Sequence, residues 1–420
     1  SNKENNVFQL VVQYGAGERE FPKLGYAAQL MNNAGIMGAY EPQELKEELS
    51  KLNATCHVTA DDDNLYIIME GYEATLPQAC QLLSRQILMP KLDEKQLARL
   101  KGSAMGMRQQ RKDNVSILNE ALRQYMLYGE KSDYIKELTD KEIYELQISE
   151  LTGDINRASN YEAKVFFTGT LPFDQVYDIL SKNLPLVANE RPSNSPQAKD
   201  MMPVTENTVY FLPNNDAEQA QIHLYIPMQK ADKKDDVLRS AFNQYFGLDF
   251  TGIVLNEIRE KRSMAYTAYA FVGTQGIAGK ASYLRGYIGT QNDKANDALD
   301  VLMGLVNDMP KNPERIDNIK SYLRQAMLTS HPSFRNKAME LVDLGYRGYT
   351  DDPAKENLPK VDALTFDDIV KFYEENIKDK PYCISIMGNP KNIDLKRLEK
   401  FGKVVKLNER KLFNTKDALF

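Results

Sequence analysis

Residues 255–266 have the sequence LNEIREKRSMAY, in which a predicted helix ends in an exposed turn and a strand begins. The strand is indicated by the aromatic and β-branched residues that alternate from Tyr266 to Phe271. Arg259 and Tyr266 lie seven positions apart, on either side of this corner. We therefore predict that both side chains project from the corner into one cavity.

The same order of elements occurs about 210 residues earlier in the chain. Residues 42–52 form a predicted helix that leads into a strand at 54–60, just as residues 252–262 lead into a strand at 265–271. This offset aligns Lys51 with Lys261. A duplicated unit of this kind determines the architecture before single residues are interpreted.

The duplication extends over nearly the whole chain. Each copy opens with a strand and a helix, contains an amphipathic helix that a proline ends, and closes with a strand and a helix. The paired segments are residues 8–14 and 221–227, 25–33 and 236–247, 79–89 and 298–309, 163–169 and 382–388, and 173–184 and 392–401. Ten extra residues of the second copy fall around 274–286, where three glycines predict a longer hairpin.

These copies predict an α+β fold of two tandem homologous repeats, each a mostly antiparallel sheet with helices packed on one face. Residues 1–190 form the first repeat and residues 208–420 the second. Residues 191–207 are rich in Pro, Ser, Asn and Gln without sustained periodicity, so they form the linker. A chain of 420 residues is long enough for two such domains.

The composition indicates a soluble globular protein. Hydrophobic residues make up 42% and charged residues 27%, and no apolar run has the ~20 residues that cross a bilayer. A net charge of -6 with both signs interspersed argues against nucleic acid as a partner.

Three scattered cysteines predict buried thiols. The polar start lacks the pattern of an export signal, as expected of a mature product or fragment, and leaves a periplasmic or a cytoplasmic location open.

With its duplicated unit and the segment from Leu255 to Lys261 leading to Ala265 and Tyr266, the chain resembles the pitrilysin/insulinase family of zinc metallopeptidases. The resemblance implies the metalloproteinase-like LuxS/peptidase fold. In that family two halves, each a pair of repeats, enclose a clam-like chamber. The first half carries zinc and the second completes the substrate site. This chain resembles the non-catalytic, C-terminal half.

The family's zinc motif, H-x-x-E-H on the opening helix of the first repeat, is degenerate in this sequence. The two histidine positions correspond to Ala28 and Asn32, the catalytic base to Met31, and the downstream glutamate falls near Met107. Zinc requires three protein ligands with available lone pairs, which these four residues cannot provide. The only histidines, His57, His223 and His331, include no pair at helical spacing. We therefore expect no zinc and no other cofactor in this chain.

Arg259 and Tyr266 correspond to the arginine and tyrosine that the family's second half presents to the bound peptide, so the resemblance makes them the candidate catalytic residues. A guanidinium can donate to a peptide carbonyl, and a phenol can donate to a developing oxyanion. Two structural alternatives stay open. Arg259 fits a helix-surface cation near a C-terminus, and Tyr266 fits an ordinary strand aromatic.

The hypothesis for function is a zinc-less half that completes the chamber and transition-state site of a zinc-bearing half, with a peptide as substrate. That partner half is a separate homologous subunit or the N-terminal part of a longer chain, and the present chain is not expected to cleave peptides alone. The alternative is a catalytically silent binding or scaffold subunit of the same fold. Residues 61–63, all aspartate, fit a solvated turn better than a cation site.

Overall fold

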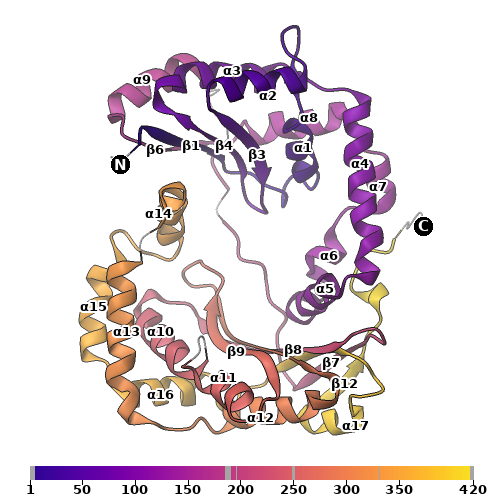
Figure 1. Ribbon diagram of the computed structural model, residues 1–420, viewed down its shortest axis with the longest axis vertical. Helices are drawn as coiled ribbons and strands as arrows, with labels where there is room; N and C mark the ends of the chain where they lie inside the picture. Colours follow the sequence, from indigo (N-terminus) through magenta and orange to yellow (C-terminus); the bar gives the residue numbers. More distant parts are fainter. Residues whose placement is uncertain (1–4, 185–190, 195, 248–250, 331, 417–420) are drawn as a thin grey trace.

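The computed structural model describes residues 5–184, 191–194, 196–247, 251–330 and 332–416. They form two lobes, with the N-terminal half at the top of Figure 1 and the C-terminal half below it. Two helices, α4 (Glu94–Gln109) and α5 (Val115–Tyr128), descend from the upper lobe to the lower one along one side. The linker crosses the space between the lobes.

The upper lobe contains a four-stranded antiparallel sheet in the order β3-β4-β1-β6. Its strands are β1 (Val7–Tyr14), β3 (Thr55–Ala60), β4 (Leu65–Tyr72) and β6 (Ala163–Thr168). Alternation along β1 sends Phe8, Leu10 and Val12 into the core and Gln9 and Gln13 to the opposite face. The core face is covered by α1 (Leu24–Met31), α2 (Pro42–Lys51), α3 (Leu76–Leu88), α8 (Ile148–Ala158) and α9 (Phe173–Asn183).

The lower lobe contains a six-stranded sheet in the order β12-β7-β11-β8-β10-β9. Its strands are β7 (Thr208–Pro213), β8 (Gln219–Lys230), β9 (Ala265–Thr274), β10 (Ala281–Gln291), β11 (Cys383–Gly388) and β12 (Lys403–Lys406). The β7–β11 and β7–β12 pairs are parallel, and the other pairs are antiparallel. The sequence patterns did not predict β7 or β12, which widen the sheet beyond the duplicated unit.

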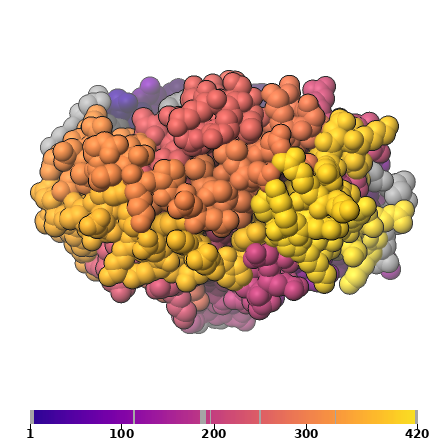
Figure 2. All heavy atoms as spheres, turned by 90° about the horizontal axis from the view of Figure 1, so that it is seen from below, coloured from indigo at the N-terminus to yellow at the C-terminus, as the bar shows by residue number. Residues whose placement is uncertain are grey.

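Helices cover one face of this second sheet and form the largest buried core of the described residues. They are α10 (Asp236–Phe246), α11 (Ile253–Leu255), α12 (Ala295–Asn307), α13 (Ile316–Thr329), α15 (Pro353–Ala363) and α16 (Phe366–Asn376). Figure 2 shows the outer surface of this lobe from below, where the orange and yellow residues of the C-terminal half gather. The predicted closing helix at 392–401 is shorter, because α17 covers only Leu395–Leu398 before a 3-10 turn.

Without β7 and β12, the two sheets have the same strand order. The first is β3-β4-β1-β6 and the second contains β9-β10-β8-β11. In chain order, β1, β3, β4 and β6 of the first sheet correspond to β8, β9, β10 and β11 of the second. This common order is what a duplication would give. The predicted insertion lies in the hairpin between β9 and β10, where Gly276 and Gly279 both adopt φ of +74°, a conformation that favours glycine.

Helix α5 packs across the lobe boundary. Its buried Leu118, Ala121 and Leu122 contact Leu212 of β7 and Met387 of β11. These strand residues lie on the sheet face opposite the main helical layer, because their neighbours Phe211 and Ile386 point into the main core. The sequence patterns placed helices on one face of each sheet and did not predict this additional helix on the other face.

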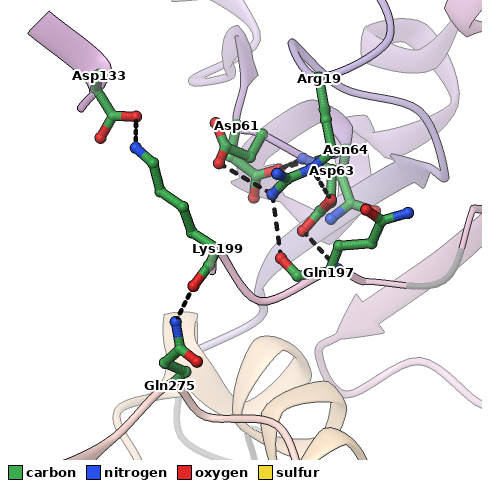
Figure 3. A network of polar contacts seen from close by, with 9 residues as sticks. Arg19, Asp61, Asp63, Asn64, Asp133, Gln197, Lys199 and Gln275 are labelled. Atoms are coloured by element: carbon green, nitrogen blue, oxygen red, sulfur yellow. Dashed lines mark hydrogen bonds and ion pairs between the residues drawn. The ribbon is translucent and has the colours of Figure 1, made fainter. Parts of the chain in front are cut away.

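The linker binds both lobes at the point where it crosses between them (Figure 3). The backbone of Gln197 accepts from Arg19 and donates to Asp63, while Arg19 also pairs with Asp62 and Asp63 at 3.1 Å each. Lys199 forms an ion pair with Asp133, and its carbonyl accepts from Gln275. The aspartate run at 61–63 is thus a turn that holds an arginine and the linker. Residue 195 of the predicted linker and residues 185–190, at the end of the predicted first repeat, lie outside the described residues.

Candidate functional site

The candidate site is the corner at which α11 runs into β9, the free edge strand of the second sheet. Its buried side is formed by Val254, Leu255 and Ile258, which pack into the main core. The predicted long helix at 252–262 is replaced by three α-helical residues and a π-helix over Asn256–Glu260. π-Helical turns are rare and occur frequently at functional sites.

The structure brings Arg259 and Tyr266 together at this corner. The Arg259 guanidinium carbon lies 5.0 Å from the centroid of the Tyr266 ring, a cation–π contact. The Arg259 side chain is one-third exposed, and its Nε lies 3.6 Å from a carboxylate oxygen of Glu260. Tyr266 is 78% exposed, so in this chain alone the pair lies on an open surface rather than inside the cavity that the sequence predicted.

The side chains of Arg259 and Tyr266 present hydrogen-bond donors at an exposed surface of this chain. A guanidinium presents a rigid fork of N–H groups that matches a carbonyl or carboxylate. The adjacent phenol can donate one hydrogen bond, with the Arg259 cation within contact distance of its ring. The geometry is therefore compatible with recognition of a peptide carbonyl, and the catalytic role of both residues remains a prediction.

None of the four degenerate zinc positions offers a suitable set of donors. Ala28 and Met31 are buried in the core of the upper lobe, and Met107 is 65% exposed on α4. The amide of Asn32 is engaged with the backbone of β3: its Nδ2 donates to the Val58 carbonyl at 2.8 Å and its Oδ1 accepts from the Val58 N–H at 2.7 Å. These residues do not fit a zinc ion.

The amide of Asn32 instead joins the end of α1 to the free edge of the first sheet, so Asn32→Ala is expected to destabilise the chain by about 1–3 kcal/mol. The substitution leaves both polar backbone groups of Val58 without their present partner. Urea denaturation measures the effect. Asn33→Ala is the matched control: Asn33 is exposed and its side-chain amide donates to the Gln29 carbonyl of its own helix, so a change within about 0.5 kcal/mol is expected. Equal losses in the two variants would contradict a role for the Asn32 link.

The histidines and cysteines form no alternative metal site in the described part of the chain. There, no three or more His, Cys, Asp or Glu side chains come close enough to hold an ion. His57 is exposed on β3, and His331 lies outside the described residues. Burial raises the pKa of the Cys80 thiol to about 12 and that of Cys383 to about 11, so both thiols stay protonated and neither is an activated nucleophile.

His223 is buried in β8 beneath α5. Its Nε2 lies 3.1 Å from Oδ1 of Asn119, and its ring contacts Tyr287. Burial, followed by the positive charges of Arg285 and Arg123, lowers the pKa of His223 to about 3. A histidine in this environment is neutral at physiological pH, and its contact with Asn119 joins α5 to the sheet.

One group at the corner was missed in the sequence. Glu257 accepts hydrogen bonds from Lys261 and Arg262, and it lies two residues before Arg259. The spacing of Glu257 and Lys261, four positions apart, is a known signal for an ion pair on a helix. The same signal does not predict the contact of Glu257 with Arg262, because residues five positions apart are not neighbours on an α-helix.

Comparison with known families matches residues 159–323 to the peptidase M16 inactive domain. No curated protein sequence matches the chain significantly. Among solved structures, a peptidase M16 inactive domain from Pseudomonas fluorescens superposes with a TM-score of 0.73 at 16% identity, covering 94% of this chain and 95% of that one.

Two longer proteases share the fold over part of their length. The ferredoxin protease FusC, in complex with Arabidopsis ferredoxin, superposes with a TM-score of 0.73 at 12% identity, covering 91% of this chain and 42% of that chain. The periplasmic protease PqqL from Escherichia coli gives 0.70 at 13% identity, covering 93% and 44%. The chain therefore spans less than half of either protease. Among the described residues, no helix is both long enough and apolar enough to span a membrane.

Proposed function

We propose that this chain, which matches the M16 inactive domain over residues 159–323 and shares its fold with inactive halves of M16 proteases, completes the peptide-binding chamber of a zinc-bearing partner half. The observation that carries the proposal is the exposed contact between Arg259 and Tyr266. The Tyr266 ring is mostly exposed, with the Arg259 cation against it, so little of its apolar surface is removed from water. This arrangement fits ligand recognition better than core packing.

In this proposal the two side chains act on the peptide rather than on the metal. The peptide lies extended along the free edge of β9, where unpaired backbone groups can bond to it. Arg259 donates to a carbonyl of the peptide, and the Tyr266 hydroxyl donates to the oxygen that becomes negative at the scissile bond. The partner half would supply zinc and the attacking water.

The lengths of the related proteases support a two-half arrangement. This chain covers 42% of FusC and 44% of PqqL, which leaves a region of comparable size in each for another half. FusC was crystallised with ferredoxin, so a protein or peptide substrate is our proposal for the complete enzyme here as well.

The test is to reconstitute the chain with a zinc-bearing half that contains H-x-x-E-H and to measure cleavage of quenched fluorescent peptides. Arg259→Ala and Tyr266→Phe are each expected to lower kcat by about 100-fold, because each removes a donor used in the transition state. Tyr177→Phe is the control, since it removes the same hydroxyl from an exposed tyrosine of the upper lobe. Full turnover in both site variants would contradict the catalytic role and favour the scaffold alternative.

A further inference from the structure

The carboxylate of Glu257 holds two cations at the outer side of the candidate corner. Lys261 donates to one of its oxygens, and Arg262 donates to the other. The same Arg262 nitrogen also donates to the Glu257 backbone carbonyl at 2.8 Å. The Glu257 side chain is only 18% exposed, and the hydrogen bonds from Lys261 and Arg262 lower its pKa. We name this arrangement of Glu257, Lys261 and Arg262 the Glu257 clamp.

The Glu257 clamp engages two of the three cations of the corner in ion pairs. Three cations and two carboxylates occur between positions 257 and 262. Because Glu257 engages Lys261 and Arg262, Arg259 is left with the exposed carboxylate of Glu260 at 3.6 Å and with the ring of Tyr266. The Arg259 donors therefore remain available to a ligand.

The clamp also closes a strained turn. Ser263 adopts φ of +50°, a left-handed conformation that is unfavourable for a residue with a side chain. On the inner side the turn is held by backbone bonds from Ser263 to the Arg259 carbonyl at 2.8 Å and from Met264 to the Ile258 carbonyl at 3.0 Å. On the outer side Arg262 reaches back across the π-helix to Glu257. Strained backbone of this kind persists only where surrounding contacts fix it.

We propose that Glu257 is a positioning residue, which holds the turn and pairs with Lys261 and Arg262, so that Arg259 is the cation stacked on Tyr266 and presented to the peptide. The catalytic consequence rests on the function proposed above. The geometric part, the placement of Arg259 on the Tyr266 ring, concerns this chain alone and can be measured without a partner.

The first experiment measures the side-chain Nε–Hε resonance of Arg259 by NMR in the full chain, assigned from its loss in Arg259→Lys. The contribution of the Tyr266 ring current is the difference in the Arg259 chemical shift between wild type and Tyr266→Leu. Glu257→Gln keeps the size of the side chain and removes its charge, and it is expected to move the resonance to its position in Tyr266→Leu. Arg262→Gln opens the clamp from the other side and should move it in the same direction, which provides a second test if one variant folds poorly.

The control is Glu260→Gln, which removes the carboxylate 3.6 Å from Arg259 Nε but leaves the pairs of Glu257 with Lys261 and Arg262 intact. This variant gives the displacement that loss of a neighbouring charge causes. Glu257→Gln is expected to move the resonance further, to its position in Tyr266→Leu, and Glu257→Asp should restore part of the wild-type shift. An Arg259 resonance unchanged in both Glu257→Gln and Arg262→Gln would overturn the proposal. So would equal displacements in Glu260→Gln and Glu257→Gln, because the effect would then come from local charge alone.

The second experiment measures cleavage by the complex with the zinc-bearing half. Glu257→Gln is expected to lower kcat by about 10-fold with KM unchanged, since a displaced Arg259 loses an interaction made in the transition state. An unchanged kcat in Glu257→Gln, beside a strong loss in Arg259→Ala, would overturn the positioning role. If Arg259→Ala itself retains full turnover, the proposed function fails, and the resonance of Arg259 still decides whether Glu257 places it.

Discussion

Between pH 7 and pH 4, His223 is expected to lower the free energy of unfolding by about 3 kcal/mol. An unfolded histidine takes up its proton near pH 6.5, whereas in the folded chain the pKa of His223 is about 3. In this window the unfolded state binds a proton that the folded state does not. The contribution is therefore fully present above pH 6.5 and is lost as the pH falls toward 3.

Urea denaturation at several pH values measures this effect, with His223→Gln as the variant. Glutamine can still bond Asn119 but does not titrate, so the variant should lose less stability on acidification than the wild type. His57→Gln is the control, because it removes an exposed histidine of β3. Parallel pH profiles for wild type and His223→Gln would show that His223 is not the source of the pH dependence.

The depressed pKa has a structural cause that extends over both lobes. His223 lies in the middle of β8, and Asn119 and Arg123, which face it, belong to α5. Protonation would place a charge between a helix of the first half and a sheet of the second, beside Arg123 and Arg285. Acidification is therefore expected to weaken the junction between α5 and the sheet first.

The parts of the fold that were predictable from sequence depend on local patterns. Apolar-rich runs gave β1 and β8, and proline ends gave α3 and α12, because these signals act over a few residues. The α+β class and the resemblance to M16 inactive halves are both supported by the comparisons. The duplication and the linker boundaries stay predictions, although the common strand order agrees with a duplication.

The parts that were not predictable depend on contacts between distant segments. An amphipathic helix such as α5 has the same pattern whichever sheet it covers, so nothing in residues 115–128 indicated that they pack on β7 and β11. The short strand β12 becomes visible only beside β7, its parallel partner. At the site, spacing predicted that Arg259 and Tyr266 would meet. The spacing of Glu257 and Lys261 is a sequence signal for an ion pair, whereas the contact of Glu257 with Arg262 required the π-helical turn.

The contact between α5 and the second sheet leads to the other large effect. Leu122→Ala is expected to destabilise the chain by about 2–5 kcal/mol, since Leu122 is fully buried against residues of the lower lobe and truncation leaves a cavity. Leu341→Ala is the matched control: it is the same substitution at a helical position that is 70% exposed, where a change within about 0.5 kcal/mol is expected.

Amide hydrogen exchange shows which elements lose stability in Leu122→Ala. If α5 is part of the cooperative unit of the lower lobe, Leu122→Ala will accelerate exchange in β7 and β11, which Leu212 and Met387 connect to the helix. Faster exchange confined to α5 would mean that the helix only rests on the sheet, and the two lobes would then be independent at this junction. In the sheet, β11 pairs with β8, β8 with β10, and β10 with β9. Faster exchange in β11 is therefore also expected to extend to β9, the edge strand that carries Tyr266.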